Sequence, residues 1–341
     1  MSPPFTIQPG PRPQIRIEEV AKRARVSPAT VSRVVNGRGK YSAETRERVL
    51  AAIDELGYVP NTAARSLAQG KTGVLGLLLP NISTEFISSL VRAIAASAAE
   101  AGYDVLLSVR PEAPARRLVG RHNTDGVLIF GHYVHEADLQ QLIHQKCPAV
   151  LMYQSSPADV PLPSVIIKNA SGARAIVGHL IEAHARRRIA FLHGVSESED
   201  STTRAEGYRE ALAEHGIAVD PRLMRRGFDA REARAATLAW VREGADFDAI
   251  FAWCDHAAAG AMEALRAAGK RVPVEVSVVG FDDAPSARHL EPALTTVRAP
   301  TDGVGYRAVQ ALVDLIQTGK AERRIELPTE LIVRRSCGCD L

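Results

Sequence analysis

The sequence predicts a small all-α unit at the N-terminus, followed by an α/β core of two lobes. Residues 17–36 have the pattern of two short helices joined by a tight turn, which predicts the first unit. From Val74 onward, apolar runs alternate with amphipathic helices, a pattern typical of parallel sheets. Residues 1–71 hold 12 of the 42 Lys and Arg residues but only 6 of the 39 Asp and Glu residues. This local basic excess favours a nucleic-acid partner for the N-terminal unit.

The first fourteen residues are rich in proline and lack the apolar run of a secretory signal. We expect residues 1–14 to form a disordered tail. No stretch of the 341-residue chain has the length and apolar character of a membrane span. Together these features predict a cytoplasmic protein with no membrane partner.

Residues 15–60 form the predicted helix-turn-helix headpiece. In its first helix, one apolar stripe follows helical spacing and consists of Ile17, Val20, Ala21 and Ala24. The second helix begins at Ser27, whose hydroxyl can accept from the first-turn N–H groups, followed by Pro28 at the favoured first position. The turn between the helices usually needs a left-handed residue, and Arg25 stands there at a cost of about 1 kcal/mol.

The outward face of the second helix is small except for one arginine, as major-groove binding requires. Pro28 and Ala29 permit close approach, and Arg33 can donate two hydrogen bonds to a guanine, so these three residues are the candidate base readers. Thr30, Ser32 and Asn36 are candidates for phosphate contacts, which set register. From these residues alone, a helix pair that serves only as packing remains an alternative.

A third helix completes the headpiece. Ser42 caps it and Gly57 ends it, and its expected apolar face consists of Val49, Leu50, Ile53 and Leu56. Residues 61–71 then form a linker with a helix too short to persist alone in water. Ala64 and Leu67 are its candidate minor-groove contacts, with Leu67 wedged between base pairs. The alternative is an ordinary linker whose leucine packs against the core.

The core, residues 72–341, shows two successive series of strands and helices. The predicted strands are GVLGLLLP, YDVLLS, DGVLIF, AVLMY, SVIIK, RIAFLHG, AIFAW and VSVVGFDD. The predicted helices span residues 86–101, 172–183, 203–215, 230–243, 255–268 and 301–318, and a last strand lies around residues 326–333. We assign residues of about 72–168 and 299–323 to the first lobe, and about 169–298 and 324–341 to the second. A ligand is expected in the cleft between the lobes, beyond the carboxyl ends of the strands.

With these units in this order, the chain resembles the LacI/GalR family of transcription regulators. The resemblance rests on VSPATVSRVVNG at 26–37, TRERVLAAIDELGYVPN at 45–61, ARSL at 64–67 and VVGFDDAPSARHLEPALTTV at 278–297. It implies a periplasmic-binding-protein-like core with an effector between its lobes. It also implies that the residues matching Pro28, Ala29 and Arg33 read the operator, and that the residue matching Leu67 is the minor-groove wedge.

By position, the resemblance implies that Arg204 and Asp282 are the polar anchors of the effector. An arginine and a carboxylate in one cleft suit a sugar or a related polyol, whose hydroxyls donate and accept. The alternative for this pair is an internal ion pair that serves only the structure. The remaining candidate effector residues, several of them forming an apolar wall, are Phe86, Ile87, Tyr153, Phe251, Trp253 and Cys254.

Several positions depart from the family pattern. Tyr153 and Lys168 stand near strand ends where an aspartate is common, and Glu85 replaces a usual proline. Residues 185–188 replace a usual glycine–histidine turn, and the segment between Ser108 and Asp125 is short. The identity of the effector therefore cannot be copied from a relative.

The four cysteines are too few and too scattered for a disulfide framework or a four-thiolate zinc site. Cys337 and Cys339 flank one glycine near the terminus, and a plain exposed tail is favoured there over a metal or redox role. We therefore expect no metal and no cofactor.

The sequence thus predicts a homodimeric regulator, most simply a repressor, that binds a palindromic double-stranded operator and responds to a small effector. No leucine heptad follows the core, so a dimer of dimers is not expected. The first rival is a solute-binding protein of a transport system, which the basic headpiece and the missing signal oppose. The second rival is an enzyme, which would need a phosphate-binding loop or a nucleophile–base pair that the sequence lacks.

Overall fold

The computed structural model describes residues 15–35, 37, 39–58, 71–109, 123–131, 134 and 136–339. The chain divides into two compact units, Met1–Thr72 and Gly73–Leu341, which correspond to the predicted headpiece with linker and to the predicted core. Within the described ranges, no helix has the length and apolar character needed to cross a membrane.

The described residues of the first unit form the helices α1 (Ile17–Ala24), α2 (Pro28–Val35) and α3 (Ala43–Leu56). Its core is small and consists of Val20, Ala21, Ala24, Val31, Val34, Val49 and Ala52. The expectation that Leu50 belongs to the apolar face is wrong, because this side chain is 39 % exposed. One residue advances a helix by about 100°, so the buried stripe that starts at Val49 continues at Ala52 and Ile53 instead.

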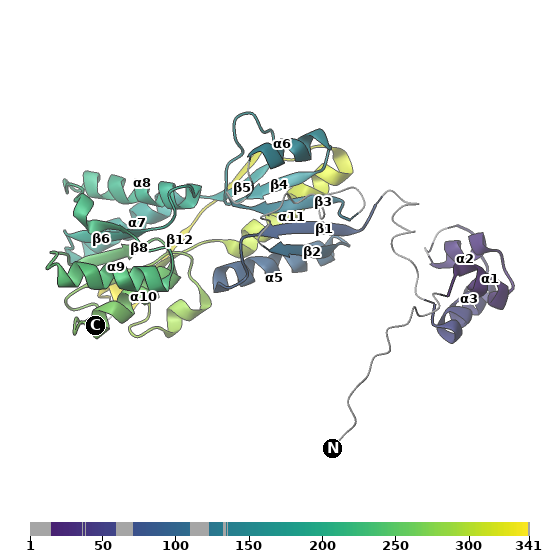
Figure 1. The fold of residues 1–341 in the computed structure, drawn as a ribbon, viewed down its shortest axis with the longest axis horizontal. Helices are drawn as coiled ribbons and strands as arrows, with labels where there is room; N and C mark the ends of the chain where they lie inside the picture. Colours follow the sequence, from purple (N-terminus) through teal and green to yellow (C-terminus); the bar gives the residue numbers. More distant parts are fainter. Residues whose placement is uncertain are drawn as a thin grey trace, which may run out of the picture. The chain divides into compact units, whose positions relative to one another are not determined.

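The first lobe of the core is a six-stranded parallel sheet with helices on both faces (Figure 1). In spatial order its strands are β11 (Arg324–Leu327), β5 (Ser164–Ile167), β4 (Ala149–Met152), β3 (Gly126–Phe130), β1 (Val74–Leu79) and β2 (Asp104–Val109). Alternate residues of these strands face opposite sides. Leu77 and Leu128 pack under α5 (Glu85–Glu100) and α11 (Thr301–Thr318), whereas Leu78 and Ile129 pack under α6 (Glu136–His144).

The second lobe is a four-stranded parallel sheet in the order β7 (Met224–Arg226), β6 (Ile189–His193), β8 (Ala249–Ala252) and β9 (Ser277–Val279). Helices α7 (Asn169–His184) and α8 (Glu199–Glu214) pack on each other and cover one face. Helices α9 (Ala230–Arg242) and α10 (Asp255–Ala267) cover the other. Strands β10 (Thr296–Arg298) and β12 (Glu330–Ile332) pair as a separate two-stranded antiparallel ribbon.

The chain passes between the lobes near residues 168, 299 and 328 (Figure 1). The first two crossings agree with the predicted lobe boundaries, but the third lies later than predicted. Strand β11 pairs with β5 from Arg324↔Ser164 to Leu327↔Ile167, so the first lobe extends to Leu327 and not only to about residue 323. Parallel pairing with a distant strand decides this boundary, and no local pattern carries that information.

Most predicted elements are present, with shifted ends. Helix α11 has the predicted bounds, while α7 and α8 begin three and four residues before their predicted starts at 172 and 203. Helix α6 and the three-residue strands β7 and β10 were not predicted. The short segment between Ser108 and Asp125 lies largely outside the described residues.

Candidate functional site

The first candidate site is the outward face of α2. Its start is as predicted: the Ser27 hydroxyl accepts from the Thr30 N–H at 3.2 Å, and Val31 and Val34 are buried against the other helices. Pro28, Ala29 and Arg33 are exposed, so these candidate base readers share the free side of the helix. Thr30 and Ser32 are half-buried at its edge. Asn36 of this set lies outside the described residues, as do Ala64 and Leu67 of the linker.

The turn before α2 has the conformation predicted for it. Arg25 has φ 54° and ψ 49°, the left-handed region, and its N–H closes the end of α1 by binding Lys22 O. The loop after α2 lies close to Arg33 on the exposed face of that helix. A Cβ added to Gly39 would lie 3.3 Å from Arg33 Cδ, so the loop passes close to the aliphatic part of the arginine side chain. Gly39 itself has φ +84°, which favours glycine.

The second candidate site is a cavity of about 480 Å³ between the two lobes of the core. This volume lies in the range of small-molecule sites. Seven of the eight predicted effector residues line it, namely Phe86, Ile87, Tyr153, Arg204, Trp253, Cys254 and Asp282. Phe251 does not line it, because this ring is fully buried and stacks on Phe191 with centroids 5.1 Å apart. Lys168 also lies outside the lining of this cavity.

Arg204 is held rigidly on the second-lobe side of the cavity. Helix α8 approaches α7 closely at Gly207, where an added Cβ would overlap the carbonyl of Ala170. This approach brings Arg204 Nε within 2.8 Å of Asn169 Oδ1, while Nη1 donates to the Trp253 carbonyl at 2.5 Å. The guanidinium carbon also lies 3.7 Å from the centroid of the Phe281 ring. The side chain is almost fully buried, so its orientation is set before any ligand arrives.

Asp282 faces Arg204 at 3.4 Å between Oδ1 and Nη1. Its backbone has φ 109°, a conformation that costs a non-glycine residue about 1–3 kcal/mol and that often marks functional sites. Burial raises the pKa of Asp282 to about 7; Arg204 opposes this rise and the neighbouring Asp200 adds to it. The ion pair considered as an alternative is therefore present, and both partners also border the cavity.

Three aromatic rings form the first-lobe wall of the cavity. Tyr153 lies between Phe86 and Phe130, with ring centroids 5.2 Å and 5.3 Å away. Tyr153 directly follows the last residue of β4, and its φ of 58° is in the left-handed region that favours glycine. Burial raises the pKa of Tyr153 far above its usual value. Among the described residues no partner has hydrogen-bond geometry to its hydroxyl, although Thr301 is close enough to act on its pKa.

On the opposite side, Trp253 presents a fixed ring. It stacks on Phe228 with centroids 5.6 Å apart, and its indole N–H donates to the Phe228 carbonyl at 3.1 Å. Gly194 makes room for it, since an added Cβ would lie 2.8 Å from the indole. The next residue, Cys254, caps α10 by accepting from the Ala257 N–H at 3.4 Å, and burial raises the pKa of its thiol.

The sequence-based prediction missed several lining residues, among them Phe130, Asp200 and Phe228, and it noted Glu85 only as a departure from the family pattern. Asp200 accepts from Asn169 Nδ2 at 2.7 Å, and burial raises its pKa to about 6, against the effect of Arg204. The only sequence feature that pointed to Asp200 was its place among acidic residues at the start of α8. Glu85 Oε2 accepts from the Ser286 N–H at 2.9 Å and so joins the two lobes at the cavity.

Comparison with known proteins identifies the family of each part of the chain. Residues 16–61 match the family described as bacterial regulatory proteins, lacI family, and residues 177–337 match a periplasmic binding protein-like domain. The chain is 35 % identical to the ribose operon repressor of Halalkalibacterium halodurans over 94 % of this chain and 96 % of that protein. It is 33 % identical to the transcriptional regulator GalR of Escherichia coli, with 94 % of each chain covered.

Two solved structures share the fold over nearly the whole chain. The lac repressor dimer bound to operator and the anti-inducer ONPF aligns with a TM-score of 0.85 at 29 % identity, covering 95 % of this chain and 99 % of that one. The complex of the regulator CelR with cellobiose aligns with a TM-score of 0.71 at 34 % identity, covering 94 % and 99 %. Because the DNA-binding family model matches the headpiece, a transport solute-binding protein is no longer a rival reading.

Proposed function

Because the chain belongs to the LacI family of bacterial transcriptional regulators, we propose that it is a repressor that binds a palindromic operator as a homodimer and responds to a sugar between its lobes. The family consists of regulators of transcription and not of enzymes. The observation that carries the sugar proposal is the cavity, in which a guanidinium and a carboxylate face a wall of aromatic rings.

A sugar suits this combination of surfaces. Its ring hydroxyls can donate to Asp282 and accept from Arg204. Two neighbouring hydroxyls have a spacing that suits the two oxygen atoms of a carboxylate or two nitrogen atoms of a guanidinium. Its C–H faces can pack on Trp253 or on Tyr153 and its neighbouring rings. The Tyr153 hydroxyl borders the cavity and offers one more polar contact, because a ligand hydroxyl can bind it in a setting where buried polar groups need partners.

The relatives point to the same ligand class. One is named a ribose operon repressor, and the structure of another, CelR, contains cellobiose. A pentose and a disaccharide differ in size, so the relatives indicate the class of the ligand and not its identity. The departures at Tyr153 and Glu85 place new side chains in this cavity, and we infer that they select the particular sugar.

The DNA part of the proposal follows from α2. Pro28 and Ala29 are small enough to let the helix enter the major groove, and Arg33 would read a guanine there. Thr30, Ser32 and Asn36 would contact phosphates, while Ala64 and Leu67 would lie in the minor groove between the two half-sites. The lac repressor dimer bound to operator supports a dimer with one headpiece for each half-site.

A thermal-shift screen of monosaccharides and disaccharides tests the proposal. A sugar that binds only the folded core raises its melting temperature in proportion to the logarithm of the sugar concentration. The operator is then selected from random DNA, and its affinity is measured with and without that sugar. We expect a change in affinity of roughly 5–150-fold, the usual size of allosteric coupling.

Two results would contradict the proposal. If no sugar shifts the melting temperature while a different class of metabolite does, the assigned ligand class is wrong. If a sugar binds but leaves the operator affinity unchanged, the cavity does not control DNA binding. The direction of the change in operator affinity shows whether the sugar releases the protein from DNA or promotes binding.

A further inference from the structure

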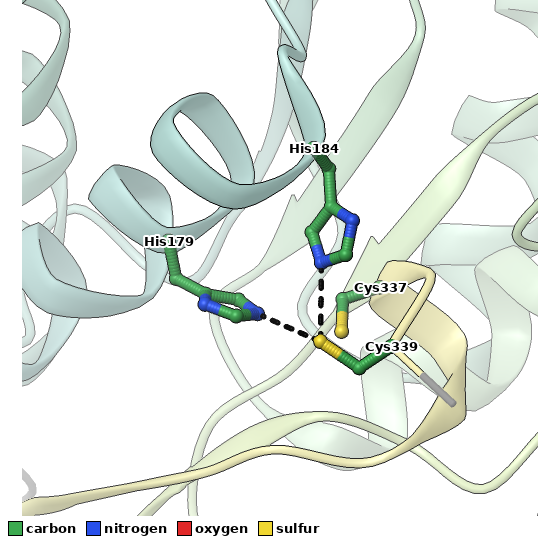
Figure 2. A group of neighbouring side chains, drawn as sticks. All are labelled: His179, His184, Cys337 and Cys339. Carbon is green, nitrogen blue, oxygen red and sulfur yellow. Dashed lines mark hydrogen bonds between the residues drawn. The ribbon is translucent and has the colours of Figure 1, made fainter. Parts of the chain in front are cut away.

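The last residues of the second lobe form a cluster that the proposed function does not use. Cys337 ends the short helix Arg335–Cys337 and Cys339 lies two residues beyond it; both face His179 and His184 in the C-terminal part of α7 (Figure 2). The two pairs are separated by more than 150 residues in the sequence. The expectation of a plain exposed tail is wrong here, because Cys337 is fully buried and Cys339 is half-buried.

The four ligand-type atoms converge on one point. The two sulfur atoms and one nitrogen from each imidazole all lie within 4.8 Å of one another. Cys339 Sγ lies 3.3 Å from His184 Nε2 and 3.7 Å from His179 Nε2 (Figure 2). In a tetrahedral zinc site with ordinary Zn–S and Zn–N bonds, a sulfur and a nitrogen lie about 3.5 Å apart. Shifts of a fraction of an ångström to about one ångström would therefore complete such a site.

The surrounding backbone is arranged to hold this geometry. Gly338 has φ +118°, and an added Cβ would lie 3.0 Å from His184 Nδ1, so glycine is needed for the turn that aims both sulfur atoms at the imidazoles. A hydrogen bond holds the backbone of Cys337 in place, since its carbonyl accepts from the Ser277 hydroxyl at 2.8 Å. The Thr295 hydroxyl lies 3.1 Å from Cys337 Sγ, as an outer-shell donor to a bound thiolate would.

We propose that His179, His184, Cys337 and Cys339 bind one zinc ion, which joins the C-terminal segment to α7. Two thiolates and two imidazoles are a preferred ligand set of Zn²⁺, and two thiolates balance its charge. Binding releases the two thiol protons to solvent.

The ion has a structural role. Four protein ligands leave no position open for a substrate or a water, which distinguishes structural from catalytic zinc sites. Helix α7 connects the zinc site with the effector cavity, because Asn169 at its other end accepts from Arg204. Zinc would therefore stabilise the lobe that supplies the polar anchors of the cavity. This proposal does not depend on the identity of the effector.

The test uses the full-length chain without a histidine tag, purified in reducing buffer with added zinc sulfate and then desalted. We expect about one zinc per chain by elemental analysis. Zinc X-ray absorption should show sulfur at about 2.3 Å and nitrogen at about 2.0 Å. Removing zinc with a chelator should lower the melting temperature of the second unit, and restoring zinc should raise it again.

Cys339→Ser and His184→Gln are the test variants, because both positions are only partly buried. Each should lose stoichiometric zinc and the zinc-dependent shift in melting temperature. Cys147→Ser is the matched control, since this cysteine lies in the first lobe next to Pro148 and should keep both properties. Cobalt added to the unsubstituted protein should give the visible absorption of a tetrahedral thiolate site, a readout that does not require any variant to fold.

Three results would overturn the proposal. The first is a zinc content far below one per chain, with no effect of added zinc on melting. The second is zinc bound through oxygen and nitrogen ligands only. The third is zinc retained in full by Cys339→Ser and His184→Gln, which would place the ion elsewhere. In each case the cluster would be a set of thiol–imidazole hydrogen bonds.

Discussion

Arg204 and Asp282 form a closely held ion pair at the cavity. A buried arginine that is already bound by Asn169, the Trp253 carbonyl and the face of Phe281 loses little further freedom when a ligand arrives. Truncating it would leave Asp282 buried without its cation, so Arg204→Ala would change folding as well as ligand binding. Substitution of the carboxylate tests the site more cleanly.

We predict that Asp282→Asn weakens sugar binding by about 10–100-fold at pH 8, the value of one hydrogen bond to a charged group. In the unsubstituted protein, ligand hydroxyls favour the ionised carboxylate. Because burial raises the pKa of Asp282 to about 7, affinity should rise with pH up to about 7 and then level off. Calorimetric titration between about pH 5.5 and 8 measures both effects.

Asp246→Asn is the control for this substitution, because Asp246 pairs with Arg188 on the exposed surface of the same lobe. It should change neither the affinity nor its pH dependence. Asp200 also faces Arg204, and burial raises its pKa to about 6. If the pH dependence persists in Asp282→Asn, the titrating group is Asp200 and our assignment is incorrect.

At the reading face, we predict that Arg33→Ala lowers discrimination at one base pair of each half-site by about 1–3 kcal/mol. The reason is that Arg33 lies on the exposed face of α2, where its guanidinium can present two donors to one guanine. Binding is measured on the operator, on variants changed at each position, and on random DNA. Arg48→Ala, on α3 and paired with Glu44, is the control and should not alter base preference. Equal losses on operator and random DNA would show that Arg33 contacts phosphate only.

At the scale of elements, the start of α5 is positioned to hold the lobes together. Thr84 caps this helix by accepting from the Ile87 N–H at 3.3 Å, and the next residue, Glu85, reaches across the cavity to the Ser286 N–H. A second contact between the lobes lies near the crossing segments, where Glu199 Oε1 accepts from the Ser155 hydroxyl at 2.6 Å. Both contacts favour the arrangement of the lobes seen in the structure.

We predict that Glu85→Ala raises the dissociation constant of the sugar about fivefold, equivalent to one exposed hydrogen bond of about 1 kcal/mol. Glu85→Gln keeps an acceptor and should retain most of the affinity. Glu100→Ala, at the other end of α5 and exposed, is the matched control. Calorimetric titration gives the affinities. Equal affinities for Glu85→Ala and Glu100→Ala would show that this contact does not contribute to closure.

At the scale of the whole molecule, the two units differ greatly in the size of their cores. Among the described residues, the headpiece buries seven apolar residues in one cluster, whereas the core unit has three clusters with many more. A unit that buries little apolar surface is only marginally stable alone. The headpiece is therefore expected to depend on DNA for much of its stability.

We predict two separate transitions in scanning calorimetry. Operator DNA should raise the temperature of the lower transition, and the sugar should raise that of the upper one, because each ligand stabilises the unit it binds. With both ligands present, the shifts should depart from additivity by the coupling free energy, which must be the same for either order of addition. A single transition that both ligands shift equally would contradict the independence of the two units.

Local patterns in the sequence determined most of the elements of this protein. Helix 301–318 was predicted to the residue, in agreement with the proline before it and the glycine that ends it. The caps at Ser27 and Ser42 were identifiable from their hydroxyls. The three-residue strands β7 and β10 were missed because so few residues show no periodicity. The candidate base readers followed from the outward face of the second helix. The polar anchors Arg204 and Asp282 came from the family resemblance, which carries position but not geometry.

Contacts between distant segments were decided only by the tertiary structure. Phe251 lies within β8 and packs in the core, whereas Trp253 lies just past the strand end, where the cavity opens. Strand β11 joins the first lobe through pairing with β5, and His184 meets Cys339 across 155 positions of sequence. Helical and strand periodicity specify which face of an element is apolar. They do not specify which distant face it meets, because that depends on how all the elements pack together.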